Sequence, residues 1–147
     1  MTQLHNLGYR TICSKLFVGD YTFLQKQDIC VDRKKDLVEV AGNICGKQHE
    51  RFRNELIRAK ENGIKLYVLI EEENIKQLDE VQFWKSPVYK SGANKGKPHT
   101  KVVGATLMKA MITMETKYGV RFLFSTKKDF GKNIIKLLKG EKINELQ

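Results

Sequence analysis

Two short, strongly apolar runs constrain the fold of this chain more than any other feature. Residues 66–70 read Leu-Tyr-Val-Leu-Ile, and residues 120–124 read Val-Arg-Phe-Leu-Phe. Such runs are typical of strands that are buried on both faces of a sheet. Helical patterns precede both runs, at residues 47–62 and 105–118, and each ends beside a glycine. Because strands and helices alternate, the sequence predicts an α/β fold with a central mixed sheet flanked by helices.

Shorter elements complete this prediction. Residues 9–18 are rich in Thr, Ile, Val and Phe and are predicted to form a strand. Residues 28–34 are predicted to form a second strand, antiparallel to the first. Residues 36–41 are predicted to form a short helix that Gly42-Asn43 breaks. The remaining helical predictions are residues 71–80, in part, and residues 128–139.

The composition is that of a globular protein. Of the 147 residues, 41% are hydrophobic and 30% are charged, which suits one domain over residues 1–147 and excludes a disordered chain. No apolar run approaches the roughly 20 residues that a membrane span needs, and the N-terminus lacks the pattern of a signal peptide. Cys13, Cys30 and Cys45 form no CxxC pair, so buried reduced thiols are predicted. We therefore expect a cytoplasmic protein with no membrane partner.

Positive charge is confined to the C-terminal part of the chain. Residues 1–84 contain 13 Lys and Arg against 13 Asp and Glu, whereas residues 85–147 contain 14 against 4, which accounts for the formal charge of +10. A one-sided excess is typical of a protein that binds a polyanion such as DNA. A lysine-rich surface that is merely solvated is the alternative, and the DNA-binding surface would then include Arg51, Arg58 and the helix that bears them. A basic loop insertion is predicted at about residues 78–101, with the DNA-binding candidates Lys90, Lys95, Lys97 and Lys101.

Asp20 and the triplet Asp32-Arg33-Lys34 form the pattern that points to chemistry. If the two predicted strands form a hairpin, both aspartates meet at one end of the sheet. Carboxylate oxygens suit Mg²⁺ or Mn²⁺, which keep several waters and bind phosphate. Lys34 lies two residues after Asp32 and projects from the same face, where it could orient or deprotonate the water that attacks phosphorus. The alternative is a charged strand end followed by a solvated basic run.

The residues around this pattern are similar to a known family. The sequence reads Val18-Gly19-Asp20-Tyr21 and then Val31-Asp32-Arg33-Lys34, with Asp36-Leu37 just after. In this order it resembles the nuclease domain of the XPF-type structure-specific endonucleases, which carry a GDY turn followed by E-R-K-x-x-x-D. This family lies within the PD-(D/E)xK superfamily, so the resemblance implies a restriction-endonuclease-like fold. The resemblance spans most of the chain, and residues 104–124 look like small phage-encoded members.

The resemblance implies a role for each residue that matches the motif. Asp20 and Asp32 would bind Mg²⁺ or Mn²⁺, with Asp32 in place of the usual Glu. Lys34 would activate the attacking water, and Arg33 would hold a backbone phosphate or brace the site. Glu55 would either join the metal ligands or form a surface salt bridge.

Two acidic residues are expected only in supporting positions. Asp36 matches the trailing acid of the motif, but at a shorter spacing. Glu71 ends the strand predicted at residues 66–70 and would lie behind the ligands. Relatives usually begin with an earlier strand that carries a further acidic residue, and this sequence starts too late to include it, so we expect either a shorter sheet or a truncated sequence. The tandem helix-hairpin-helix module of many relatives is not present in these 147 residues either. DNA contact would then come from the nuclease domain and its basic half.

These observations predict a metal-dependent DNA endonuclease. It would hydrolyse phosphodiester bonds at branched DNA or at junctions between single and double strands, a preference that comes from the resemblance alone. A catalytically inactive nuclease fold that binds DNA or a partner is the alternative. A homodimer is a further expectation, with Met108, Met111 and Met114 either in the core or at a subunit surface.

Overall fold

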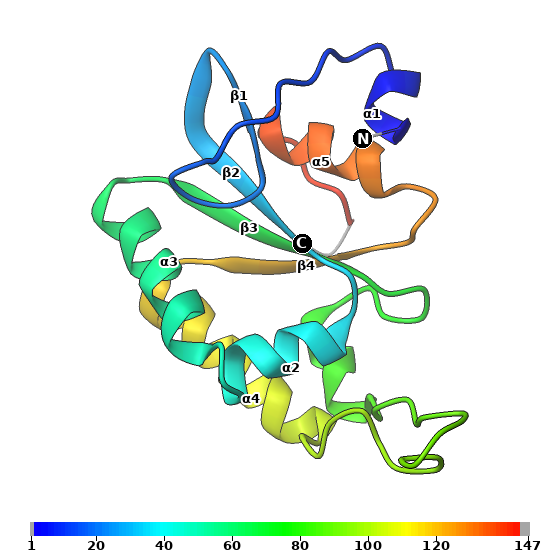
Figure 1. Cartoon of the computed structure of the whole chain (residues 1–147). Coiled ribbons are helices and arrows are strands. Elements are labelled where there is room, and N and C mark those ends of the chain that lie inside the picture. Colours follow the sequence, from blue (N-terminus) through cyan, green and yellow to red (C-terminus); the bar gives the residue numbers. More distant parts are fainter. Residues whose placement is uncertain (1, 145–147) are drawn as a thin grey trace.

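The computed structural model describes residues 2–144, which fold around a four-stranded sheet in the order β1-β2-β3-β4 (Figure 1). The short strand β1 (Tyr21–Phe23) runs antiparallel to β2 (Lys26–Lys34). The next two strands, β3 (Lys65–Glu71) and β4 (Arg121–Ser125), run parallel to β2 and to each other. The prediction of an α/β fold with a mixed sheet is confirmed.

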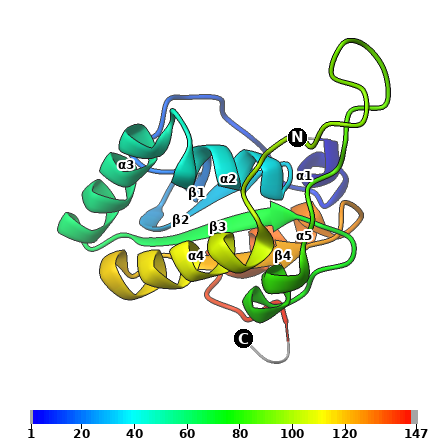
Figure 2. The same ribbon diagram turned by 90° about the horizontal axis from the view of Figure 1, so that it is seen from below.

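Helices cover both faces of the sheet (Figures 1 and 2). One face carries α2 (Leu37–Cys45), α3 (His49–Glu61) and α4 (Gly104–Tyr118). The opposite face carries α5 (Phe130–Leu138), and the short helix α1 (Thr2–Asn6) packs against α5. A 3₁₀ helix, η1 (Leu78–Phe83), precedes the long loop that leads to α4.

Alternation along β3 explains why the core has two halves. Leu66, Val68 and Ile70 point toward α2, α3 and α4, whereas Leu69 lies between them in sequence and packs against the α5 side. All four side chains are almost completely buried, because helices cover both faces of this strand. The apolar run at residues 66–70 is therefore the central strand that the sequence predicts.

The two principal helices end where the sequence predicts. The chain leaves α3 through Asn62 and Gly63, which has a positive φ of 65°, and α4 ends at Gly119 with φ 74°. Glycine adopts this left-handed backbone without the steric cost that a side chain brings. Met111 of α4 is fully buried, and Met108 and Met114 pack against the same core, so the chain uses these methionines in its own interior.

The prediction of a strand at residues 9–18 is wrong. This segment is irregular, and Ile12 and Phe17 are 78% and 59% exposed. The hairpin strand is instead β1, in which Tyr21 pairs with Val31 of β2. Gly19, with φ 71°, turns the preceding chain away from the end of β2, so that residues 9–18 have no strand beside them.

Two smaller predictions also fail. Gly42-Asn43 does not break the helix, because α2 continues to Cys45 and buries Ile44, which offsets the roughly 1 kcal/mol that a helical glycine costs. Of the three cysteines predicted to be buried, only Cys30 is; Cys13 and Cys45 are exposed. Cys13 lies in the irregular segment before Gly19 and Cys45 is the last residue of α2, and neither position faces the core.

The segment predicted as a basic insertion begins with η1. Val81 of η1 is fully buried and Leu78 packs against the core, whereas Phe83 is exposed, and the predicted helical tendency of residues 71–80 is realised in part in this 3₁₀ turn. The exposed loop proper covers residues 85–103 and projects from one end of the molecule (Figure 2). Isolated bridges, Val88 to Pro98 and Tyr89 to Lys95, fold it back on itself. Within residues 2–144, no helix has the length and apolar character needed to cross a membrane.

Candidate active site between β2 and α3

Gly19 and Asp20 form a tight turn that fixes the first carboxylate against β2. The Asp20 backbone N–H donates to the Val31 carbonyl at 2.9 Å, and its Oδ2 accepts from the Arg33 backbone N–H at 2.8 Å. A Cβ at Gly19 would lie 3.1 Å from the Val31 carbonyl oxygen, so glycine suits both the conformation and the space. Asp20 therefore precedes β1, and the hydrogen bonds hold it beside the end of β2.

Asp32 and Lys34 project from the same face of β2, as the spacing of two residues predicts. Lys34 Nζ lies 3.1 Å from Asp32 Oδ2, in an ion pair that lacks hydrogen-bond geometry. The same ammonium lies 5.2 Å from the ring centroid of Phe52, a buried residue of α3. The aromatic ring and the acid together hold the lysine in the space between strand and helix.

Burial makes Asp32 an unusual carboxyl group. It is 5% exposed, and its pKa is raised from 3.8 to about 8. Loss of solvent is the largest cause of this rise, and the adjacent carboxyl groups of Asp20 and Glu55 contribute to it, whereas the charge of Lys34 lowers the pKa. Two acids and one lysine thus surround Asp32, and the lysine does not offset the cost of burial. Such clusters of perturbed acids occur preferentially at functional sites.

Glu55 enters the same cluster from α3. Burial raises its pKa, the charges of Lys34, Arg58 and Arg51 lower it, and that of Asp20 raises it. Its Oε1 is buried and makes no hydrogen bond, as is also true of Asp32 Oδ2. Of the two orientations that the sequence left open, the structure therefore has Glu55 facing the aspartates and not paired at the surface.

Two clefts meet at this cluster. One, of about 580 Å³, lies between β2, α2 and α3 and contains Asp20, Asp32, Lys34 and Glu55. The other, of about 630 Å³, lies between the irregular segment before Gly19 and α3. Three residues, Asp20, Arg51 and Glu55, line both. Asp20 and Glu55 therefore lie where the two clefts join, and Asp32 lies within the first cleft.

The donor set suits a hard divalent cation. Its ligands would be oxygens of Asp20, Asp32 and Glu55, and two of these side chains have a buried oxygen without a hydrogen-bond partner. Oxygen ligands are those that Mg²⁺ and Mn²⁺ prefer, and Mg²⁺ commonly uses one or two carboxylates and fills the rest of its shell with water and phosphate. In the described part of the chain, no three acidic, His or Cys side chains are grouped closely enough to hold a metal by themselves. The three carboxylates therefore suit a divalent cation by their chemistry, but they do not form a complete set of metal ligands in this structure, and a cation would need further ligands from water or phosphate.

Three predicted site residues do not place their side chains in the cluster. Arg33 is among the residues that line the cleft, but its guanidinium lies on the opposite face of the sheet, 5.2 Å from the Phe130 ring centroid, and its backbone N–H donates to Asp20. Asp36 caps α2, because its Oδ1 accepts from the Glu39 backbone N–H at 2.8 Å. Glu71 follows Ile70 on β3 and by alternation belongs to the α5 face, away from Asp32.

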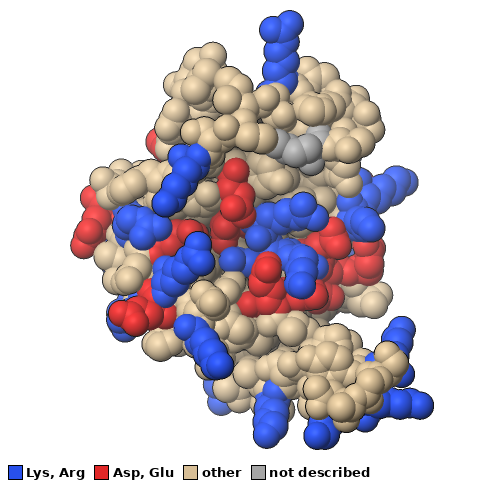
Figure 3. All heavy atoms as spheres, in the orientation of Figure 1, with Lys and Arg blue, Asp and Glu red and all other residues tan. Residues whose placement is uncertain are grey.

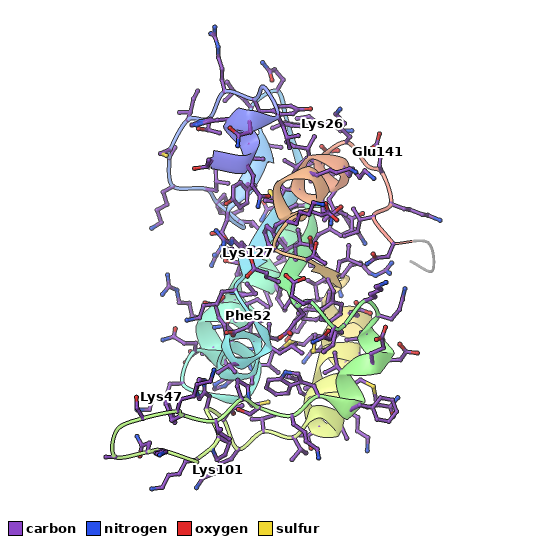
Figure 4. The ribbon with its side chains drawn as sticks, turned by 90° about the vertical axis from the view of Figure 1, so that its right-hand side faces the viewer. Lys26, Lys47, Phe52, Lys101, Lys127 and Glu141 are labelled. Carbon is purple, nitrogen blue, oxygen red and sulfur yellow. The ribbon has the colours of Figure 1, made fainter. Side chains whose placement is uncertain are left out.

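The predicted DNA-binding lysines stand apart from the carboxylates. All four are exposed and belong to the loop at residues 85–103, which lies at the lower end of the molecule in Figure 1: Lys90, Lys95, Lys97 and Lys101. On the face shown in Figure 3, this end carries basic side chains alone, whereas acidic and basic groups alternate across the middle. Figure 4 places Lys101 at that end, below the level of Phe52.

Sequence patterns gave no reason to select several residues that line the cleft around Asp32. Asn43 has a buried side-chain oxygen without a hydrogen bond, and Gln48 and Glu39 complete the wall. Asn43 and Gln48 flank the end of α2, which the sequence did not predict to reach so far. Arg51, which the sequence suggested with Arg58 as an alternative DNA-binding position, lines this cleft as well and lies four residues before Glu55 on the same helix.

Comparisons with known proteins agree with this geometry. The ERCC4 domain family matches residues 1–138. The solved structure of XPF from Aeropyrum pernix superposes with a TM-score of 0.64 at 19% sequence identity, over 99% of this chain and 57% of that chain. A second structure, of XPF from Aeropyrum pernix in complex with DNA, gives a TM-score of 0.56 at 18% identity, over 99% of this chain and 61% of that one. Among curated protein sequences, none matches.

The resemblance that the motif implied is therefore confirmed, and so is the restriction-endonuclease-like fold. At these identities the two structures establish the fold alone. The chain spans less than two thirds of the length of either XPF chain.

Proposed function

The chain belongs to the ERCC4 domain family, and on that premise we propose that it is a divalent-metal-dependent DNA endonuclease. One observation carries the proposal: Asp20, Asp32 and Lys34 line one open cleft, which joins a second cleft at Asp20 and Glu55, and the carboxyl group of Asp32 is buried with a raised pKa. Neither a surface ion pair nor a packed core requires a carboxyl group in this state. A phosphodiester backbone that lies along the clefts would reach it.

Asp20, Asp32 and Glu55 are the proposed ligands of Mg²⁺ or Mn²⁺. The bound ion would neutralise charge on the scissile phosphate and lower the pKa of the attacking water. To serve as a ligand, Asp32 must release the proton that burial favours, so binding of the cation is coupled to loss of a proton. Glu55 would also bind the cation in its deprotonated form, and burial raises its pKa as well.

Lys34 is the proposed residue that orients the attacking water. Its ammonium already lies between Asp32 and the Phe52 ring, within the cleft that would hold the phosphate. Arg33 stands on the other face of the sheet, so its contribution is to fix Asp20 through its backbone N–H.

DNA is the proposed substrate, at branched sites or at junctions between single and double strands. One XPF structure to which this chain is similar is a complex with DNA, and we extend DNA binding to this chain. The exposed lysines of the loop, Lys90, Lys95, Lys97 and Lys101, would add long-range attraction to the phosphate backbone. A homodimer, also expected from the resemblance, would have to use α4 residues other than its buried Met111.

The test is cleavage of flap, fork, splayed-arm and linear DNA in Mg²⁺, Mn²⁺ or EDTA. We expect cleavage of a branched substrate that EDTA abolishes and that Asp20→Asn eliminates. Asp28→Asn is the matched control, because Asp28 is an exposed carboxylate of β2 that lies outside both clefts. Cleavage that persists in EDTA would rule out the mechanism.

A DNA-binding module without nuclease activity is the second candidate. It is favoured by one observation, that no three potential metal ligands are grouped among the residues that the structure describes. The same experiment separates the two proposals: a protein that binds branched DNA but cleaves none of the panel in either metal is a binding module.

A further inference from the structure

The second cleft is lined differently from the catalytic one. Beyond Asp20 and Glu55 it is bordered by Ser14, Lys15 and Phe17 on one side and by the side chains of α3 on the other. It contains no further acidic residue, whereas three basic residues reach it: Lys15, Arg51 and Arg58. Moving away from the carboxylates, the cleft therefore becomes basic and gains an aromatic side chain.

Helix α3 aligns its basic residues along this cleft. Arg51, Glu55 and Arg58 follow one another at spacings of four and three residues, so they share one face of the helix. Phe52 and Leu56 lie on the adjacent face of the helix and are buried in the core, which fixes the position of this row of charged side chains. The two arginines flank the proposed ligand Glu55, and Arg51 also lines the catalytic cleft.

Phe17 is held over the cleft in an exposed position. Arg58 Nε donates to the Phe17 carbonyl at 3.3 Å, and the guanidinium carbon lies 5.9 Å from the centroid of the ring. Phe17 is nevertheless 59% exposed. A ring that rests on a cation and is otherwise open to solvent is prepared to stack on a planar, apolar partner.

We propose that this cleft binds an unpaired nucleotide segment next to the scissile phosphate. Its base stacks on Phe17, and its backbone phosphates lie against Lys15, Arg51 and Arg58. A base in a duplex has both faces covered by its neighbours, so a stacking platform selects a single strand. The proposal rests on the proposed function, because it places the cleavage site at the boundary of an unpaired segment.

A fluorescent base gives a test that does not depend on cleavage. The full chain is titrated, in EDTA, with a splayed-arm DNA that carries 2-aminopurine in the unpaired arm beside the junction. Stacking on Phe17 should quench its fluorescence. Phe17→Ala should lose the quench and weaken single-strand binding by about 5- to 150-fold, the range of base–aromatic stacking, whereas Phe17→Trp should retain both. Phe83→Ala is the matched control, because Phe83 is 78% exposed and lies outside both clefts.

The arginines are tested by salt dependence. Arg58→Ala should lower the salt slope for single strands by about 0.7, the value for one phosphate contact, while Arg53→Ala, an exposed arginine of the same helix outside the clefts, should leave it unchanged. Absence of quenching in the wild type, or equal quenching with Phe17→Ala, overturns the inference. Loss of quenching in Phe17→Ala supports it even if no substrate is cleaved, in which case the nuclease proposal alone has failed.

Discussion

The carboxylates between β2 and α3 are withdrawn from water, whereas the lysines of the loop at residues 85–103 are surrounded by it. Asp32 is 5% exposed and surrounded by Asp20, Lys34 and Glu55, and burial raises its pKa to about 8. The lysines of the loop are all exposed and have no acidic neighbour in that segment. Both regions contain ionisable groups. Ionisation of the buried carboxyl groups lowers the stability of the folded chain, whereas the exposed lysines are charged without such a cost.

This difference separates two tasks that a nucleic-acid enzyme must perform. Groups in a desolvated cleft interact strongly over short distances, and so they can distinguish a transition state from a ground state. Exposed lysines are screened within about 8–10 Å at physiological salt and act mainly on association. The first region comes from the charge-neutral half of the sequence and the second from the half that holds the entire excess of +10. The distribution of net charge therefore indicates which residues would attract DNA, but it does not indicate where the proposed active site lies.

The largest effect is expected from the aspartates. Asp20→Asn and Asp32→Asn should each reduce cleavage in Mg²⁺ to the background, because an amide is a poor ligand for a divalent cation. Affinity for DNA in EDTA should stay within a few-fold of the wild type. Cleavage is measured as the initial rate on a branched substrate, and affinity for DNA is measured by fluorescence anisotropy. A variant of either kind with substantial activity would remove that residue from the proposed ligands.

Lys34→Ala should follow, with cleavage about 10²–10⁴-fold slower, the usual range for general acid–base catalysis. DNA binding should be preserved, since one lysine is a small part of the total charge. Lys35→Ala is the control, because Lys35 is the next residue and is exposed outside the cleft. Single-turnover rates are the measurement. Equal rates for Lys34→Ala and Lys35→Ala would show that the water is oriented by another group.

Asp32→Asn should also make the protein more stable in EDTA. In the unfolded chain the pKa of Asp32 is near 3.8, and folding raises it to about 8. Between these values the unfolded chain binds fewer protons, so wild-type stability falls as pH rises from about 4 to 8. The variant avoids this loss.

The gain in melting temperature should therefore be absent below pH 4 and largest near pH 8, at about 2–4 °C for each kcal/mol. Mg²⁺ should reduce the difference in melting temperature between the variant and the wild type, because it should stabilise the wild type alone. Differential scanning calorimetry over this pH range is the measurement. A gain that is independent of pH would mean that packing, and not ionisation, distinguishes the two proteins.

The local part of the site was predictable, because it depends on short spacings. Gly19-Asp20 and Asp32-x-Lys34 required only a hairpin and the alternation of a strand. The same alternation places Arg33 on the opposite face, which the motif alone did not reveal. The central strands and the two long helices were predictable for the same reason, since their apolar periodicity is local.

Features that depend on distant packing were not predictable. Residues 9–18 have the composition of a strand, but the positive φ of Gly19 leaves them without a neighbour to pair with. Helix α2 passes through Gly42 because burial of Ile44 outweighs propensity. The second cleft likewise arises only when the irregular segment around Phe17 is placed beside Arg58 of α3.

The smallest effect on chemistry is expected from the loop. Simultaneous replacement of Lys90, Lys95, Lys97 and Lys101 by alanine should weaken duplex binding equally for all sequences. Counterion release gives a slope of about −0.9 per phosphate neutralised on duplex DNA, so each lost contact should flatten the salt dependence by that amount. The single-turnover rate of bound substrate should not change, because these lysines lie outside the clefts that contain the carboxylates. Arg51→Ala is the comparison: it lines both clefts and should affect binding and rate together. A quadruple variant with the wild-type slope would mean that the loop is only solvated and that the arginines of α3 provide the DNA contact.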